Sequence, residues 1–495
     1  MISVQIIDKS SGRYEVYRTV GSSENAQEID RLYKEGKKEI EQITGQGRLS
    51  FDKDKEQEFL DVFYNSIEDL RLVGPELLLG KLFDEIGFNK IEDELFRELV
   101  ITRLIYPVSK LKTTDYLYKY KGISYDVAGI YRYLDKLHRG QIEQVQQISY
   151  NHTLKITDQS LSIVFYDVTT LYFEAAQEDD FRQNGFSKDG KHSQPQIVLG
   201  LLVSAGGYPL TYQAFEGSKF EGHTLLPVIK AFNEKYKLEQ VIVVADAGLL
   251  SDKNIKALEE HQYQYILGAR IKNETQEVQK ELLSLKLSDG ESKTIAKSET
   301  VNLIISYSES RAKNDQHNRK RGMQKLEKLL AKGKLTKGHI NNKGYNKYLK
   351  LTGEVNITID YDKFKHDVKW DGLKGYLTNT TLTKEEVIHQ YKQLWFIEKT
   401  FRISKSDLKI RPVYHHLKRR IEAHICIAFA ACKIYKELER QLNLLKADLS
   451  PEKAIDILKT IYALTARSPY SDTKHIRLIL KNEEQIQLLD LFKIR

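Results

Sequence analysis

The fold of this chain is decided by one stretch of sequence, Val241-Ile242-Val243-Val244-Ala245-Asp246-Ala247-Gly248. The first five residues are apolar and mostly β-branched, which predicts a strand buried on both faces. Helical patterns flank this strand at 223–236 and 253–261, and a further strand is expected at 263–267. Strands that alternate with helices in this way are typical of a parallel α/β sheet. Asp246 stands where the buried strand ends.

Three more strands are expected upstream, at 161–168 with a continuation to 173, at 197–203 and at 210–215. A Gly-Gly turn between the last two predicts antiparallel links among these strands. In a sheet of order 3-2-1-4-5 the first and fourth strands are neighbours, and such sheets bind ligands at the carboxyl ends of their strands. Asp167, in the first strand, would then lie beside Asp246.

A third carboxylate is expected from the helix that contains Tyr391-Lys392-Gln393-Leu394-Trp395-Phe396-Ile397-Glu398-Lys399-Thr400-Phe401-Arg402-Ile403-Ser404-Lys405. Upstream, Thr383 and Glu386 form a capping box that predicts the start of the helix. Spacings of three and four residues place one set on a single face that is expected to pack inward: Ile388, Tyr391, Leu394, Trp395, Glu398, Phe401 and Arg402. On this stretch alone, Glu398 is better explained as a residue in a salt bridge with neighbouring cations.

Together the three acids predict a metal site. Each aspartate taken singly is more often a cap at the end of a strand, but three converging carboxylates repel one another unless cations bridge them. Oxygen ligands of this kind suit Mg²⁺ or Mn²⁺. Two such ions activate a water or a 3′-hydroxyl and stabilise the leaving oxygen of a phosphodiester.

The composition limits the class of protein. The 495 residues allow two to four domains, and 77 Lys and Arg against 69 Asp and Glu give a net charge of +8, which favours an anionic partner. Cys426 and Cys432 are the only cysteines, so neither a disulfide framework nor a Cys-based zinc site is expected, and a reducing, intracellular location is predicted. The N-terminus lacks a signal pattern, and the longest apolar run, 197–205, is too short to span a membrane.

The remaining segments are expected to surround this α/β block. Residues 1–150 read as a mainly helical N-terminal region that begins with a hairpin at 2–7 and 13–20 and contains a pair of helices joined near Gly122. That pair fits either a DNA-binding helix-turn-helix or plain helix packing. Residues 271–370 form an insertion with strand-like runs and a basic tract, 311–350, of thirteen Lys or Arg and two acids. The tract fits either a solvated helix face or a phosphate-contacting surface.

With these residues in place, the chain resembles bacterial insertion-sequence transposases of the DDE type, in the group whose catalytic helix carries a Tyr-x2-Arg-x3-Glu-x6-Lys signature. The matching positions are Tyr391, Leu394, Glu398 and Lys405. The spacing agrees throughout, but Leu394 replaces the arginine of the family. The resemblance covers roughly residues 160–440.

The resemblance implies a ribonuclease H-like α/β fold: a mixed five-stranded sheet with flanking helices, a mostly β insertion and a helical N-terminal region. The catalytic domain would comprise 158–270 and 371–442, interrupted by the insertion 271–370 and followed by a helical tail, 443–495. Asp167, Asp246 and Glu398 would be catalytic and would ligate two Mg²⁺ or Mn²⁺ ions. The implied DNA contacts are Tyr391, Lys399, Arg402 and Lys405.

The function expected on these grounds is metal-dependent cleavage at transposon ends followed by strand transfer into target DNA. The implied partners are double-stranded DNA and a second copy of the chain, in the cytoplasm of a bacterium and with no membrane. Two alternatives remain open: a ribonuclease H-like nuclease without strand transfer, and a DNA-binding protein derived from a transposase that has lost catalysis. The sequence does not define the terminal repeats or the target site.

Overall fold

The computed structural model describes residues 1–44, 53–157, 161–174, 177–185, 194–238, 241–249, 251–341, 344–352, 356–411, 413–468 and 471–494. The chain forms two compact units. The first comprises residues 1–70 and 464–477, and the second comprises 71–463 and 478–495.

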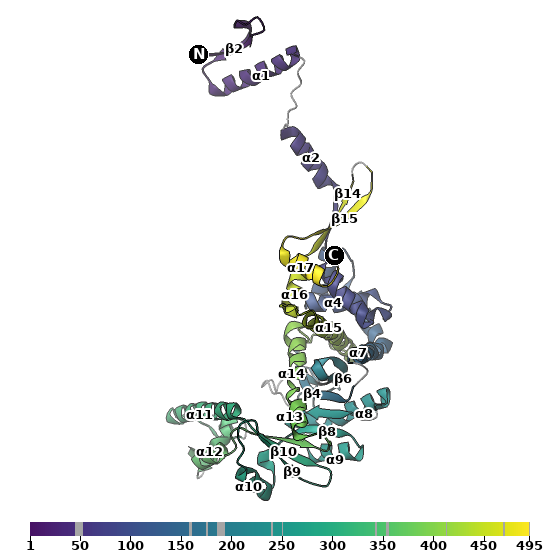
Figure 1. The fold of residues 1–495 in the computed structure, drawn as a ribbon, viewed down its shortest axis with the longest axis vertical. Coiled ribbons are helices and arrows are strands. Elements are labelled where there is room, and N and C mark those ends of the chain that lie inside the picture. Colours follow the sequence, from purple (N-terminus) through teal and green to yellow (C-terminus); the bar gives the residue numbers. More distant parts are fainter. Residues whose placement is uncertain are drawn as a thin grey trace. The chain divides into compact units, whose positions relative to one another are not determined.

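An eight-stranded mixed sheet forms the middle of the second unit (Figure 1). Its strands stand in the order β6-β5-β4-β7-β8-β13-β10-β9. Their bounds are β4 Ile163–Tyr172, β5 Gln196–Ser204, β6 Pro209–Glu216, β7 Ile242–Ala245, β8 Gln264–Ala269, β9 Ser292–Ala296, β10 Asn302–Tyr307 and β13 Leu373–Thr378. The first five positions follow the predicted order 3-2-1-4-5, which is thereby confirmed.

The sheet continues beyond the five predicted strands. β4, β7 and β8 are parallel, and β5 and β6 are antiparallel on one side. On the other side β13 pairs antiparallel with β8, followed by β10 and β9. An open edge on β8 would present unpaired backbone groups, and β13 covers that edge. The insertion therefore contributes two strands, β9 and β10, to the main sheet itself.

Helices cover both faces of the sheet. Side chains alternate along each strand, so neighbouring residues belong to different cores. Phe165 and Val244 pack in the core on the side of α13, α14 and α15, whereas Tyr166 and Val243 pack in the core on the side of α8 and α9. The bounds of these helices are α8 Leu225–Tyr236, α9 Asp252–Glu260, α13 Lys384–Lys392, α14 Trp395–Arg402 and α15 Lys418–Leu444.

The predicted continuous helix that carries Glu398 is divided into α13 and α14. The capping box of Thr383 and Glu386 is confirmed at its start. At Gln393 and Leu394 the backbone hydrogen bonds tighten to a three-residue spacing, so the residues that follow are displaced around the helix axis from their places in a continuous α-helix. Consequently the predicted inward face is wrong for Glu398, which is exposed, as are Trp395 and Arg402.

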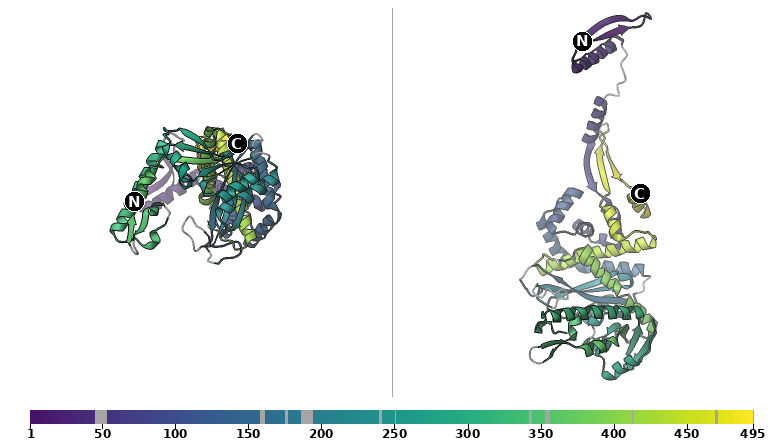
Figure 2. Two further views of the ribbon diagram at one scale, coloured as in Figure 1. Left: turned by 90° about the horizontal axis from the view of Figure 1, so that it is seen from below. Right: turned by 90° about the vertical axis from the view of Figure 1, so that its left-hand side faces the viewer.

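The insertion is mixed rather than mostly β. Strands β11 (Leu349–Thr352) and β12 (Asn356–Ile359) pair as expected, but three helices accompany them. Their bounds are α10 Gln276–Ser284, α11 Glu309–Ala331 and α12 Tyr361–Val368. The high charge of α11 hides its helical period, so the sequence showed a charged tract there. α11 packs with β11, β12 and Phe364 of α12 around a small core of its own. Figure 2 shows this part of the chain in green from two further sides.

The N-terminal helices of the second unit pack around α15. They are α3 Lys81–Ile86, α4 Glu94–Ile105, α5 Lys110–Tyr116, α6 Val127–Lys136 and α7 Ile142–Ile156. Ser109 and Asp126 cap α5 and α6, and Gly122 joins the pair in a left-handed conformation. α5 and α6 contact each other and α6 contacts α15, so the plain packing that the sequence allowed is present; DNA contact by this pair stays a prediction.

The first unit begins with the predicted hairpin. Its elements are β1 Ile2–Asp8, β2 Glu15–Ser23, α1 Ala26–Thr44 and α2 Lys53–Ser66. The predicted helical tail also contains strands, because the alternating pattern at 462–479 forms β14 Tyr462–Arg467 and β15 Lys474–Ile479 between α16 Pro451–Leu458 and α17 Glu483–Leu491. These strands form a sheet of order β15-β14-β3 with β3, Ile67–Leu72.

Candidate active site

Asp167 and Asp246 lie side by side on two inner strands of the sheet, at the point where β7 ends. In the parallel pair β4–β7, Tyr166 is opposite Ala245, and the two aspartates are the next residues along the chain. The residues two positions earlier on each strand face α13, α14 and α15, so the alternation directs both carboxylates to that same side. Asp167 is half-buried and Asp246 is exposed.

Tyr391 of α13 reaches Asp246 directly. Its hydroxyl donates a hydrogen bond to Asp246 Oδ1 at 3.0 Å, although the side chain is only 5% exposed. The approach depends on Gly268 in β8, because a Cβ at that position would overlap the Tyr391 hydroxyl. Burial, and then the charge of Asp246, raise the pKa of Tyr391 above its usual value, so the phenol remains a proton donor.

Glu398 comes from α14, which packs against β4, the strand of Asp167. The helix is fixed by Thr400, whose hydroxyl donates to the backbone oxygen of Gly207 at 3.0 Å in the turn between β5 and β6. Glu398 therefore stands on the exposed side of a helix whose other side is anchored to the sheet.

Lys374 lies among these acids, although no motif in the sequence marked it as a site residue. Its Nζ is 4.4 Å from the centre of the Tyr391 ring. Burial, and then the charge of Arg311, lower the pKa of Lys374, while the charges of Asp246 and Glu398 act in the opposite sense. One feature of the sequence could have pointed to Lys374. It stands two residues before Tyr376 in an expected strand, so both side chains are on the same face of that strand.

The carboxylate oxygens of Asp167, Asp246 and Glu398 are the type of ligand that a hard divalent cation prefers. Three carboxylates on adjacent elements of one face offer only oxygen ligands, the type that Mg²⁺ and Mn²⁺ take. Within the described stretches, however, no three His, Cys, Asp or Glu residues form a group tight enough to hold a metal ion. The carboxylates are thus brought to one face without being assembled into a closed ligand set.

The cations predicted to contact DNA have different surroundings. Lys399 forms an ion pair with Glu439 of α15, so α15 and not Glu398 provides its partner. Arg402 is exposed on α14, and Lys405 is half-buried, with its Nζ 5.6 Å from the centre of the Phe401 ring. Leu394, at the arginine position of the signature, is 7% exposed and belongs to the core.

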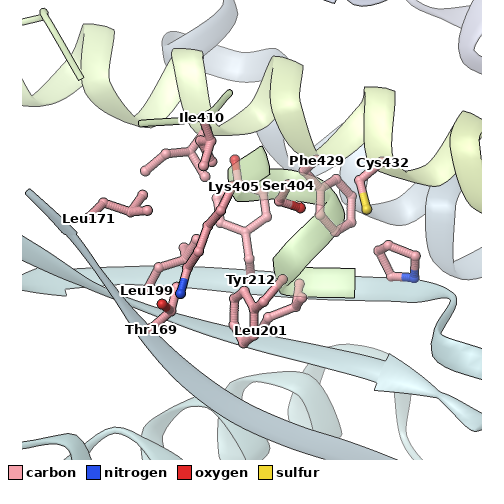
Figure 3. Close-up of a pocket in the computed structure, with 13 residues that line it drawn as sticks. Thr169, Leu171, Leu199, Leu201, Tyr212, Ser404, Lys405, Ile410, Phe429 and Cys432 are labelled. Carbon is pink, nitrogen blue, oxygen red and sulfur yellow. The ribbon is translucent and has the colours of Figure 1, made fainter. Parts of the chain in front are cut away.

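Lys405 borders a small apolar pocket between the sheet and α15. Figure 3 shows its side chain extending toward Thr169 on β4, two residues beyond Asp167. The cavity has a volume of about 20 Å³, room for about one water molecule, so it is not a substrate site. Lys405 is therefore held close to the strand that carries Asp167.

A family model described as a transposase DDE domain matches residues 158–432 of the chain. This match covers more than half of the sequence and contains Asp167, Asp246 and Glu398. The chain belongs to this DDE transposase family. The sequence-based expectation of a DDE transposase is thus confirmed at the level of the family and of a mixed α/β fold with helices on both faces.

Among solved structures, the chain is similar to a piggyBac transposase synaptic complex with hairpin DNA, determined by cryo-EM. The identity is 9%, the TM-score is 0.40, and the match covers 78% of this chain and 79% of that chain. An identity and a TM-score this low support no statement about the activity or partners of this chain. A search of curated proteins finds no match. Among the described helices, none is long and apolar enough to cross a membrane.

Proposed function

We propose that this DDE transposase cleaves the ends of its own element and joins the freed 3′-hydroxyls to target DNA. The observation that carries the proposal is the placement of Asp167 and Asp246 on neighbouring parallel strands, facing the helix of Glu398. These residues would hold Mg²⁺ or Mn²⁺, most simply two ions, which when bound supply an activated oxygen nucleophile and stabilise the leaving oxygen.

The protein's own groups have defined tasks in this proposal. Tyr391 holds one oxygen of Asp246 and so orients that carboxylate, while Lys374 places a positive charge beside the acids where a phosphate would approach. Arg402 and Lys405 extend positive charge along the same helix toward the DNA backbone. Because Lys399 is paired with Glu439, we assign it a secondary part in DNA binding.

The test uses duplexes that carry the inverted repeats flanking the reading frame. Asp167→Asn, Asp246→Asn and Glu398→Gln should each abolish Mg²⁺-dependent strand cleavage and leave DNA binding largely intact. Glu385→Gln, on the neighbouring helix and exposed, is the matched control and should cleave normally. Normal cleavage by any one of the three site variants would overturn the assignment of that residue.

A second assay separates the proposal from the two alternatives. Pre-cleaved ends are offered with a supercoiled plasmid, and joined products are expected only from a transposase. Cleavage without joining would favour a ribonuclease H-like nuclease, and metal-independent binding without nicking would favour a silent DNA-binding protein. The mass of the complex on paired ends tests the proposed homodimer. Since the substrate would be chromosomal DNA, we place the reaction in the bacterial cytoplasm.

A further inference from the structure

A second basic site lies apart from the carboxylates, in a cavity of about 430 Å³ between the start of α5 and the segment that leads into α15. None of the described residues that line it is Asp or Glu, whereas seven are Lys, Arg or His. A cavity of this size can hold a nucleotide-sized group.

Four of these basic side chains are buried. The exposed fractions are 5% for Arg103, 6% for Lys110, 9% for His415 and 6% for His424. His424 lies 3.1 Å from the backbone oxygen of Ile410 through Nε2 and 3.5 Å from Arg103 through Nδ1. Nε2 is therefore the donor and Nδ1 the acceptor, which makes the ring neutral. Arg103 and Lys110 are therefore the buried side chains here that can hold an anion through a positive charge.

Among the described residues, no carboxylate is one of the groups that shift the pKa of Arg103 or Lys110. Burial, and then the charge of Arg103, lower the pKa of Lys110 well below its usual value. Burial, followed by Lys110 and Arg103, lowers the pKa of His415 to about 3. No described carboxylate contributes to either change. Removing two charges from water without a counter-ion is strongly unfavourable, so the arrangement is suited to an anion that enters the cavity.

The rim of the cavity is open and basic. Lys112 and Lys409 are exposed, and Tyr414 is 66% exposed. An anion on a long polymer can therefore enter here without being enclosed, which favours a strand of nucleic acid over a small free ion. Arginine and lysine at such rims track a phosphate backbone and release its counter-ions.

Residues in and next to the cavity contact β4, the strand that carries Asp167. Val413 bridges to Phe173 at the end of β4, and the Arg411 guanidinium lies 5.0 Å from the centre of the Tyr172 ring. Tyr172 follows Asp167 by five residues along β4, a distance of roughly 17 Å at about 3.3 Å per residue. This equals about five base steps of a duplex, so one DNA molecule is able to reach both places.

We propose that this cavity binds a backbone phosphate of the DNA duplex, with Lys110 and Arg103 as its buried ligands. The inference rests on the proposed function, since it assumes that DNA is the substrate. It adds an anchoring point outside the carboxylate site and gives the helices α4 and α5 a direct role in holding DNA.

The test is a scan in which single phosphates of the end duplex are replaced by neutral methylphosphonates. For the wild-type protein, one position served by the cavity should weaken binding about tenfold. Lys110→Met should bind the unmodified duplex about tenfold more weakly and become insensitive to that same substitution. Its affinity should also fall less steeply with salt, by about 0.9 in the slope of log K against log salt.

Lys119→Met is the matched control, because Lys119 is exposed nearby and does not line the cavity. It should retain the methylphosphonate profile of the wild type. His415→Phe preserves the ring packing against Tyr131 and provides a second variant should Lys110→Met fold poorly. It should also weaken binding at the same position, because an apolar ring replaces a polar one in the lining of the cavity.

An unchanged methylphosphonate profile in both cavity variants would overturn the proposal while leaving the function intact. A second result would also overturn it: inorganic phosphate stabilises the wild type but not Lys110→Met, while both proteins bind DNA with equal affinity. The site would then take a free anion and not DNA. Failure of the wild type to bind any duplex would overturn the proposed function as well.

Discussion

At the scale of single residues, the hydroxyl of Tyr391 connects the signature helix to the sheet. The family resemblance implied a contact between this tyrosine and DNA, and its position makes a different contact: the hydroxyl is buried and donates to Asp246. A residue that holds a metal-binding carboxylate in one orientation affects the metal without touching it. The DNA contact of Tyr391 stays a prediction.

Tyr391→Phe tests this positioning role. We expect Mg²⁺-dependent cleavage to fall roughly tenfold to a hundredfold. The free energy of unfolding should fall by only about 1 kcal/mol, because Asp246 is exposed and water replaces the lost donor. Cleavage rates are measured across a Mg²⁺ titration, and a higher metal requirement is expected. Tyr376→Phe, whose ring neighbours Tyr391, is the control and should be close to the wild type.

Gly268→Ala should reproduce the same defect from the other side of the contact. The added methyl group displaces the Tyr391 hydroxyl from Asp246 and also crowds the backbone of Ala247. In a double-mutant cycle on cleavage rates, Gly268→Ala and Tyr391→Phe should be far from additive, because both remove one interaction. Fully additive effects would mean that the two residues act independently. Gly140→Ala, where a Cβ meets nothing, is the tolerated control.

Leu394→Arg restores the arginine of the family signature and should be harmful here. Position 394 is buried in the core between α13 and α14, so an arginine would be an uncompensated buried charge and should cost roughly 3–5 kcal/mol of unfolding free energy. Trp395→Arg, one residue later and 50% exposed, should change stability little. Both are measured by urea denaturation. Equal stability of the two variants would contradict the core position assigned to Leu394.

At the scale of elements, α14 is positioned by the turn between β5 and β6. Gly207 has a φ of +79°, and a Cβ there would lie 3.0 Å from Thr400 Oγ1 and 3.1 Å from the Phe396 backbone oxygen. The two segments are far apart in sequence, yet this close approach sets where Glu398 stands relative to β4.

Gly207→Ala should therefore reduce both stability and cleavage. Gly12→Ala is a matched control, since Gly12 has a φ of +77° and nothing within 4 Å of its Cβ position. The control isolates the cost of the left-handed conformation, about 1–2 kcal/mol. Gly207→Ala should lower the free energy of unfolding by more than that amount and should also slow cleavage. Gly12→Ala should leave the cleavage rate unchanged. Thermal melting and a cleavage assay measure the two effects, and equal behaviour would contradict this role of the turn.

At the scale of the whole molecule, the part of the insertion that follows β10 is a long connection at the tip of the β10–β13 hairpin in the main sheet. Tyr307 and Leu373 are directly opposite in the β10–β13 pair. The segment between them has its own small core, formed mainly by Met323, Leu326, Tyr348, Leu349 and Ile359. Trp370 instead packs in the main core, so it belongs with the sheet.

This architecture predicts which deletion the chain tolerates. Replacing residues 309–369 by a short Asn-Gly link between Ser308 and Trp370 should leave a folded sheet, because the hairpin partners remain in register. The variant loses the basic α11, so its DNA binding should weaken and depend less on salt. Deleting 271–370 instead should abolish folding, because β9 and β10 are lost. Circular dichroism and melting distinguish the two, and a folded 271–370 deletion would contradict the topology.

The sequence by itself determined the central strands, their order, the capping box and the family. The strands, their order and the capping box follow from local periodicity, from turn residues and from the alternation of strands with helices, all of which act over a few neighbouring residues. The family instead followed from the resemblance of the motifs around Asp167, Asp246 and Glu398 to those of DDE transposases. The positions of Asp167 and Asp246 on adjacent strands also followed, because parallel strands end at the same edge of a sheet.

Only the tertiary structure decided what surrounds these acids. The break at Gln393 and Leu394 turned Glu398 outward, since the packing of Ile397 and Phe401 against the core outweighs the continuity of one helix. Lys374 joins the site from β13, a strand that follows the insertion in the sequence. Contacts between residues remote in sequence leave no local pattern, so the buried cations Arg103 and Lys110 were likewise recognisable only once the helices had packed together.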